Sequence, residues 1–353
     1  MRKINKIFSK KKSISLDLFL EKALYHRNFG YYQKHNPFGI KGDFVTAPNI
    51  SNIFCEIVTI WVISFWENLN KPKHLNFIEL GPGNGDFCLV LIKTLKNFPE
   101  IFNSINIILY EKSEKLKKIQ KKRIISKKVS WVNNLKEIKN GPVIFFGNEF
   151  LDALPIKQFK KVNHDIYEKY VALQKNNIKF VFKKAPKKQV NKLKNFKLLS
   201  ENGIIEYPEY GFKELEIICK KIKKLNGGVL FIDYGYKTKN NINTLQSVVK
   251  HKYNDIKENI GNADITSLVN FNLYKDYFNW NNLYVEKIIT QSEFLQKLGI
   301  IERMKILNKK ISLQERSNLN LRIKRLLHPG LMGQNFKVIF AKNKKCSFSL
   351  AFK

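Results

Sequence analysis

From residue 73 onward, short apolar runs alternate with longer amphipathic stretches, and this alternation constrains the fold more than any other feature of the chain. Short continuous apolar runs are typical of strands that are buried on both faces. A helix between consecutive strands allows them to lie parallel in one sheet, with helices on both sides. The pattern therefore predicts an α/β fold with a doubly wound parallel sheet. Its first strands are expected at Asn76–Leu80, Ile105–Tyr110, Val129–Val132 and Val143–Phe146, with helices at 85–96 and 113–125.

The rest of the chain is expected to supply a cap and two insertions. Residues 1–72 predict a helical N-terminal cap with a lid loop, because Ser15 and Ser51 stand at positions where helix N-caps are favoured. Residues 73–353 are expected to form the domain around the sheet. Its later strands are expected at Val229–Tyr234, Asn282–Ile289 and Phe336–Lys342, with a β-rich insertion at about 156–208 and a helical insertion at about 291–334.

The charge of the chain raises the question of nucleic-acid binding. Lys and Arg number 64 against 29 Asp and Glu, which gives a formal net charge of +35. A charge of this size is typical of nucleic-acid binders. However, 57 of the basic residues are Lys and 7 are Arg, alongside 39 Asn. Arg is the side chain that binds phosphates and bases bidentately, so a nucleic-acid binder would be expected to use more of it. The excess of Lys and Asn over Arg is more typical of an A+T-rich genome. We predict no specific nucleic-acid partner.

Cysteines and targeting signals point to a reducing compartment. The four cysteines form no CxxC pair and have no histidines at ligand spacing, so neither a metal site nor a disulfide framework is expected. The apolar stretch Ile53–Trp66 is short and contains Glu56, which predicts a buried helix and no membrane span. The basic segment Met1–Lys12 lacks the apolar core of a secretory signal. We expect the cytoplasm if the source is bacterial, which we favour, and the mitochondrial matrix if it is eukaryotic.

The first apolar run ends in a glycine-rich loop that indicates a specific ligand. Gly81, Gly83 and Gly85 alternate with other residues, Pro82 among them, and a helix follows. Such glycines allow a sharp turn and a close approach of the backbone to a ligand at the helix N-terminus. A dinucleotide fold would place its third glycine one residue later. Glu79 would repel a pyrophosphate, but it suits the ammonium and sulfonium groups of S-adenosylmethionine.

The next two strand ends are compatible with the same ligand. Glu111 follows the second strand, 26 residues beyond Gly85, where a carboxylate can accept hydrogen bonds from both ribose hydroxyls. Dinucleotide folds use the same device, so Glu111 indicates an adenosine ligand without choosing between the cofactors. Asn133 follows the third strand, and its amide is expected to meet the adenine. We predict that S-adenosylmethionine is the cofactor.

The motifs along nearly the whole chain resemble those of one family, the protein arginine methyltransferases related to mitochondrial complex I assembly factor 7, which has close bacterial relatives. The set of motifs in this order is far more specific than the glycine loop alone. The matching segments are Gly30-Tyr-Tyr, Gly42-Asp-Phe-Val-Thr-Ala-Pro48, Glu79-Leu-Gly-Pro-Gly-Asn-Gly85, Asn148-Glu-Phe-Leu-Asp-Ala-Leu-Pro155, Ile232-Asp-Tyr-Gly235 and Met332-Gly-Gln-Asn-Phe-Lys-Val338.

The resemblance implies a Rossmann-like class I methyltransferase fold and symmetric dimethylation of an arginine in a core subunit of respiratory complex I. The partner would be a protein substrate, and whether the chain forms a homodimer stays open. We also expect three further cofactor contacts: Asp43 and Thr46 in the lid loop, and Asn148 after the fourth strand. Two departures remove a carboxylate each, since the family usually has Glu in place of Asn49 and Asp in place of Asn270. They put the substrate in doubt but leave cofactor binding untouched.

Methyl transfer to a guanidinium requires carboxylates, because the attacking nitrogen has a delocalised lone pair and must lose a proton. Glu149 and Asp152 follow the fourth strand, at the carboxyl edge of the sheet where ligands bind. Asp233 and Tyr234 end the neighbouring strand and are expected to face the same space. These four residues are the predicted catalytic group. Asp152 as a turn cap, Tyr234 as a packed aromatic and Asp43 as a turn residue remain as alternatives.

Other functions also remain open. A methyltransferase of this fold could act on another protein or on a small molecule. Nucleobase amines are disfavoured, because Asn148-Glu-Phe-Leu stands where an Asn-Pro-Pro-Tyr type of tetrapeptide would be expected. A protein that assembles complex I by binding alone would need neither Glu79 nor Glu111.

Overall fold

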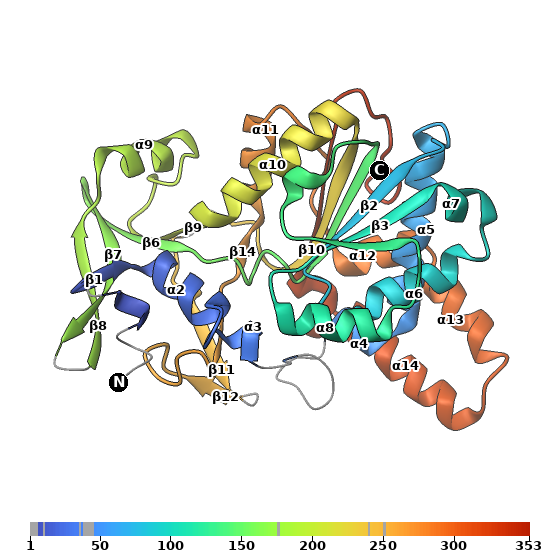
Figure 1. Cartoon of the computed structure of the whole chain (residues 1–353), viewed down its shortest axis with the longest axis horizontal. Helices are drawn as coiled ribbons and strands as arrows, with labels where there is room; N and C mark the ends of the chain where they lie inside the picture. The colour runs from blue at the N-terminus through green and yellow to red at the C-terminus, as the bar shows by residue number, and fades with distance from the viewer. Residues whose placement is uncertain are drawn as a thin grey trace.

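The computed structural model describes residues 6–9, 11–34, 37, 46–174, 177–238, 241–249 and 252–353. Within this part of the chain, the main feature is a nine-stranded sheet in the order β15-β17-β10-β5-β2-β3-β4, with β14 beside β10 and β16 beside β17 (Figure 1). The predicted α/β fold with a parallel sheet is confirmed. The main strands are β2 (Leu75–Leu80), β3 (Ile105–Tyr110), β4 (Val129–Val132), β5 (Val143–Asn148), β10 (Gly227–Tyr236) and β17 (Phe336–Lys342).

The order of the strands determines where a ligand can bind. Strands β2, β3, β4, β5 and β10 are parallel, and β17 runs antiparallel to β10. Strands β3 and β4 lie on one side of β2, and the next strand in the chain, β5, lies on the other side. Such a reversal leaves a crevice at the carboxyl ends of the strands that flank it. The ends of β2 and β5 therefore mark the expected site.

Helices cover both faces of the sheet. Alternate side chains of a strand point to opposite sides, and here both sides are apolar, so both must be buried. Phe146 and Leu230 belong to the core on one face, and their neighbours Phe145 and Phe231 belong to the core on the other. The first face is covered by α5 (Asn52–Asn68), α6 (Asp86–Leu95), α12 (Gln291–Lys297), α13 (Ile300–Asn308) and α14 (Leu313–Leu327), and the second by α10 (Glu209–Leu225) and α11 (Phe271–Trp280).

A second sheet lies beside the first, on the left of Figure 1. Its order is β1-β7-β6-β9, with β8 paired to β7. Four of these strands, β6 to β9, lie where the β-rich insertion at about 156–208 was expected, but β1 was not predicted. Ile14 pairs with Val171, so the start of the chain closes one edge of this sheet. The elements are β1 (Ser13–Ser15), β6 (Lys157–Val162), β7 (Asp165–Gln174), β8 (Asn177–Lys184), α9 (Lys187–Asn195) and β9 (Gly203–Tyr207).

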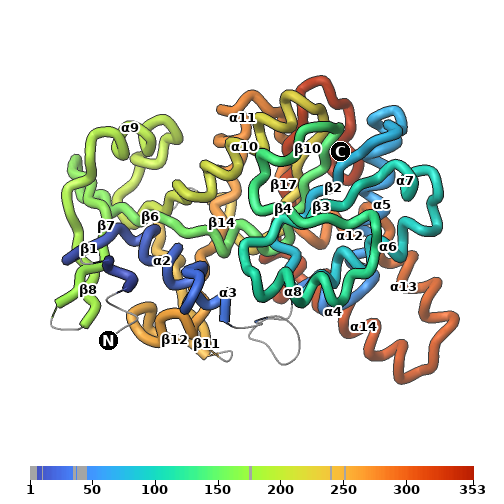
Figure 2. The backbone as a smooth tube through the Cα atoms, in the orientation of Figure 1, coloured from blue at the N-terminus to red at the C-terminus, as the bar shows by residue number. Residues whose placement is uncertain are grey.

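The N-terminal helices lie between the two sheets. Figure 2 shows α2 next to the second sheet and α3 close to α8. Ser15 stands at the predicted N-cap position of α2, although its side chain makes no capping hydrogen bond, whereas Ser51 caps α5 by accepting from the amide of Ile53 at 3.3 Å. The elements are α2 (Leu16–Tyr25), α3 (Tyr31–Lys34), α4 (Ala47–Ile50), α7 (Pro99–Ser104), α8 (Glu114–Arg123), η1 (Leu135–Glu137) and η2 (Pro329–Gly333).

The prediction of one strand at Asn282–Ile289 is wrong. The segment forms two short strands, β15 (Tyr284–Val285) and β16 (Ile289–Thr290), which both pair with β17. Val285 lies opposite Ala341 and Ile289 opposite Val338, so the segment holds one residue more than the strand it faces. This extra residue is a bulge, which interrupts the ladder. Elements not predicted are α11, β14 (Val269–Asn270) and a small sheet of β11 (Gln246–Val249), β12 (Lys252–Asn254) and β13 (Asp264–Thr266).

Over the described ranges, no helix combines the length and the apolar character needed to span a bilayer.

Candidate functional site

The glycine loop after β2 has a backbone that few other residues could adopt. Gly81, Gly83 and Gly85 have φ angles of 65°, 54° and 80°, in the left-handed region where only glycine carries no penalty. A Cβ on Gly85 would also come within 2.7 Å of Cδ1 of Ile124. The loop therefore curls back on itself and leads into the N-terminus of α6 at Asp86.

Two pockets meet at this loop. The larger has an empty volume of about 550 Å³ and the smaller about 460 Å³. Both are lined by Gly81, Gly83 and Glu149, so they adjoin at the end of β2, and we refer to the two pockets together as the groove. Of the other predicted residues, Glu111 lines the larger pocket, and Thr46, Glu79, Pro82 and Asn148 line the smaller one.

Glu79 is a buried carboxyl group that lines the smaller pocket. Its side chain is 5% exposed, and its Oε2 has no hydrogen-bond partner. Burial, with the nearby carboxylates of Asp86 and Glu111, raises the pKa of Glu79 to about 8. A buried acceptor of this kind favours a ligand that brings a donor or a positive charge.

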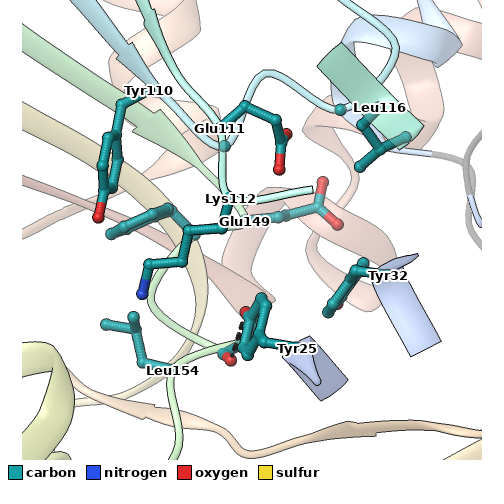
Figure 3. A pocket seen from close by; sticks show the side chains of 12 residues that line it. Tyr25, Tyr32, Tyr110, Glu111, Lys112, Leu116, Glu149 and Leu154 are labelled. Carbon is teal, nitrogen blue, oxygen red and sulfur yellow. Dashed lines mark hydrogen bonds between the residues drawn. The ribbon is translucent and has the colours of Figure 1, made fainter. Parts of the chain in front are cut away.

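Glu111 points into the larger pocket, where Figure 3 shows its carboxyl group and that of Glu149 directed into the same space. One oxygen accepts from the amide of Ser113 at 2.7 Å, and the other from Nε2 of Gln120 at 3.3 Å. Burial raises the pKa of Glu111 to about 7, although these hydrogen bonds act in the opposite direction. The carboxyl group is thus held in one orientation.

Glu149 combines strain with a position shared by both pockets. Its φ angle of 51° is uncommon for a residue with a side chain, and such strain concentrates at functional sites. Its Oε1 accepts from Nδ2 of Asn148 at 3.1 Å and from the amide of Ala47 at 3.4 Å. Burial and the charge of Asp152 raise the pKa of Glu149 to about 8, while Arg325 lowers it.

Asp152 and Asp233 lie close enough to Glu149 for their charges to interact, and Tyr234 is hydrogen-bonded to Asp152. The Tyr234 hydroxyl donates to Oδ2 of Asp152 at 2.5 Å, and Oδ1 of Asp152 has no partner. Asp233 is 0% exposed and accepts from the amides of Leu151 at 2.8 Å, Asp152 at 3.3 Å and Tyr234 at 2.9 Å. Oδ2 of Asp233 therefore holds the loop after β5, while Oδ1 is used by the backbone of its own strand. None of these three is among the described residues that line the two pockets.

Two further predicted cofactor residues, Asn133 and Gly85, are absent from the described lining of both pockets. Oδ1 of Asn133 accepts from Nζ of Lys117. Asp43 lies outside the described residues. Gly85 caps α6 beneath the loop.

Asn49 and Asn270, the two expected departures from the resembled family, have local hydrogen-bonding roles. Asn49 donates from Nδ2 to Asp86 at 2.6 Å and accepts from the hydroxyl of Thr46 at 3.1 Å. Asn270 caps α11 by accepting from the amide of Leu273 at 3.2 Å. Asn270 lies away from the described lining of both pockets, whereas Asn49 lines the smaller one.

Two tyrosines that line the larger pocket, Tyr25 and Tyr32, were not among the predicted site residues. Their rings stack at 5.3 Å, below the two carboxyl groups in Figure 3. The Tyr25 hydroxyl donates to the carbonyl of Ala153 at 3.0 Å, and the Tyr32 hydroxyl donates to Oδ1 of Asp264 at 3.0 Å. The motif Gly30-Tyr-Tyr contained the signal for Tyr32, but nothing near Tyr25 in the sequence marked it. Across the described part of the chain, no three His, Cys, Asp or Glu side chains gather as metal ligands.

The sheet is open and mostly parallel, a glycine loop with left-handed φ angles follows β2, and a carboxylate suited to a ribose, Glu111, follows β3. These features define a Rossmann-like protein that binds an adenosine cofactor. A sequence model of S-adenosyl-L-methionine-dependent methyltransferases matches residues 57–286, more than half of the chain. The chain belongs to this family of methyltransferases, and its cofactor is S-adenosylmethionine.

Similar proteins include a solved structure and several curated relatives. A protein from Burkholderia thailandensis, bound to S-adenosyl-homocysteine, has the same fold, with a TM-score of 0.82 and 22% identity over 98% of this chain and 92% of that one. The mitochondrial protein arginine methyltransferase NDUFAF7 of Xenopus tropicalis is 29% identical over 357 residues, which cover 92% of this chain and 81% of the relative. The human NDUFAF7 is 26% identical over 352 residues, 92% and 78% of the two chains.

Proposed function

We propose that this methyltransferase modifies a guanidine nitrogen of an arginine in a protein substrate. The observation that carries the proposal is the set of unpaired buried acceptors at adjacent strand ends, namely Oε2 of Glu79, Oδ1 of Asn148 and Oδ1 of Asp152. Acceptors without donors suit a cationic cofactor beside a cationic side chain. The mitochondrial relatives named as protein arginine methyltransferases support the same substrate class.

We assign the two halves of the groove to the two halves of the cofactor. The larger pocket, with Glu111 and the rings of Tyr25 and Tyr32, would hold the adenosine. The smaller pocket, with Glu79 and Asn148, would hold the methionine moiety. Glu149 lines both pockets, so it stands where the reactive centre between the two halves would lie. Asn133, whose Oδ1 accepts from Nζ of Lys117, follows β4 and would contact the adenine.

S-adenosylmethionine supplies an electrophilic methyl group on a sulfonium centre. The chain must hold the guanidinium in line with it, exclude water and accept a proton. We assign orientation and proton acceptance to Glu149, because its pKa of about 8 would fall when the guanidinium of the substrate binds beside it, which leaves the carboxylate free to accept a proton. Asp152, held by Tyr234, would also attract the positive side chain. Asp233 would act as a positioning residue for this loop.

We further propose that the substrate is a core subunit of respiratory complex I and that the product is symmetric dimethylarginine. The second sheet and the helices within 291–334 would recognise the protein, because none of their described residues lines the two pockets. The N-terminal cap would contribute to both functions, since it also supplies Tyr25 and Tyr32. The compartment would be the bacterial cytoplasm or the mitochondrial matrix, according to the source organism.

The test is transfer of labelled methyl groups to the complex I core subunit of the same organism, followed by mass spectrometry of its arginines. Glu149→Gln should lower transfer by roughly 10²- to 10⁴-fold, as expected for loss of a proton acceptor, with cofactor affinity within a few-fold of wild type. Glu302→Gln, on the exposed side of α13, is the matched control.

Near-normal turnover of Glu149→Gln would remove Glu149 from the chemistry. Labelled methyl groups on another protein or on a small molecule, and none on the complex I subunit, would show that the proposed substrate is wrong. Cofactor binding without any transfer would favour an assembly protein that acts by binding alone.

A further inference from the structure

Gln120 on α8 is fully buried, and its amide connects three segments of the site. Nε2 donates to the carbonyl oxygen of Gly83 at 2.7 Å and to Oε2 of Glu111 at 3.3 Å. Oε1 accepts from Nε1 of Trp131, on β4, at 2.9 Å. One side chain therefore ties together the glycine loop, the end of β3 and the neighbouring strand.

The partners determine both the orientation of this amide and the residue type. A carbonyl and an ionised carboxylate only accept hydrogen bonds, and an indole N–H only donates one. Both hydrogens on Nε2 and the oxygen of Gln120 are therefore used. A glutamate at this position would place a carboxylate oxygen, which is an acceptor, against the carbonyl of Gly83 and the carboxylate of Glu111, which are also acceptors. A methionine would fill a similar volume but would make none of the three hydrogen bonds.

We propose that Gln120 is a positioning residue for the cofactor, which holds the Glu111 carboxylate and the Gly83 carbonyl in the geometry that the ribose requires. The inference rests on the proposed placement of the adenosine at Glu111. Gln120 is not among the described residues that line the pockets, so it acts through Glu111 and the loop.

The surroundings of Glu111 make this role measurable. Burial raises the pKa of Glu111 to about 7, and the hydrogen bonds from Ser113 and Gln120 lower it. Lys117 from the same helix as Gln120 also favours the ionised form, whereas Glu79 and Tyr110 face Glu111 from β2 and β3. Loss of the Gln120 donor should therefore move the ionisation of Glu111 to higher pH.

The experiment is titration calorimetry with S-adenosylhomocysteine and with its analogue that lacks both ribose hydroxyls, from pH 6 to pH 9. The proteins are the wild type, Gln120→Met, Gln120→Glu and the control Gln296→Met, which alters an exposed glutamine on α12. Gln120→Met should weaken binding of S-adenosylhomocysteine by roughly 10- to 100-fold, the range for a hydrogen bond to a charged group. The analogue should lose far less, and the midpoint of the pH profile should rise. Gln120→Glu should bind least well at high pH.

Equal losses for both ligands with an unchanged pH midpoint would overturn the positioning role and leave Gln120 as packing. Unchanged affinity of Gln120→Met would also overturn it. A wild type that does not distinguish the two ligands would overturn the ribose placement together with the inference. Transfer to arginine is not measured here, so a wrong substrate assignment would leave this result intact.

Discussion

Glu149→Gln should make the protein more stable while it removes activity. Burial raises the pKa of Glu149 from its ordinary 4.5 to about 8, so the folded state binds a proton that the unfolded state has released. Between pH 4.5 and pH 8 the unfolded state therefore holds fewer protons, and the free energy of unfolding falls as pH rises. The shift corresponds to at most ~5 kcal/mol at pH 8. Because the side chain is only half-buried, we expect ~2 kcal/mol.

The substitution keeps the local contacts. The amide oxygen of a glutamine can still accept from Asn148 and from the backbone of Ala47, as Oε1 of Glu149 does. The assay is urea unfolding of the wild type, Glu149→Gln and Glu302→Gln at pH 5 and pH 8. The advantage of Glu149→Gln should be small at pH 5 and reach ~2 kcal/mol at pH 8, with no such trend in the control. An equal or lower stability of Glu149→Gln at pH 8 would refute the reasoning.

Two further outcomes follow from the groove. Gly83→Val should abolish binding of S-adenosylmethionine in calorimetry, because a branched residue at a φ of 54° would distort the loop and fill the approach to the ligand; unchanged affinity would remove the loop from the site. Affinity for S-adenosylmethionine should increase from pH 6 to pH 7.5, by up to roughly tenfold per pH unit, since a cationic ligand favours the charged form of Glu79. S-adenosylhomocysteine, which lacks the sulfonium charge, should show a weaker trend, and equal pH profiles for the two ligands would contradict this coupling.

The parallel sheet was predictable because its signal is local. Each buried strand is a continuous apolar run, and the loop after β2 carries its glycines at adjacent alternate positions. The strand at Asn282–Ile289 was wrong because a bulge depends on the register against β17, which the segment itself does not reveal. Strand β1 was missed for a similar reason: Ser13–Ser15 is too short to show a pattern, and its partner lies far along the chain.

The site shows the same division. Glu79 and Glu111 were identified from their spacing to the glycine loop, and the structure places both at the groove. Asp233 and Asp152 are equivalent candidates in the sequence, since Asp233 lies near the end of one predicted strand and Asp152 follows another that ends at the same edge of the sheet. Only the structure shows that Asp233 is used by three backbone amides while Asp152 keeps an unpaired oxygen.

The net charge of +35 says little about the chemistry, because the residues at the groove are acidic. The sequence by itself determined the class of fold, the cofactor and the two carboxylates nearest the glycine loop, since these depend on local periodicity and short spacing. Only the tertiary structure decided the strained backbone of Glu149, the tyrosine wall from the N-terminal helices and the contacts of Gln120. These features arise from contacts between segments distant in the chain, and their energies depend on burial and on hydrogen-bond partners that exist only after folding.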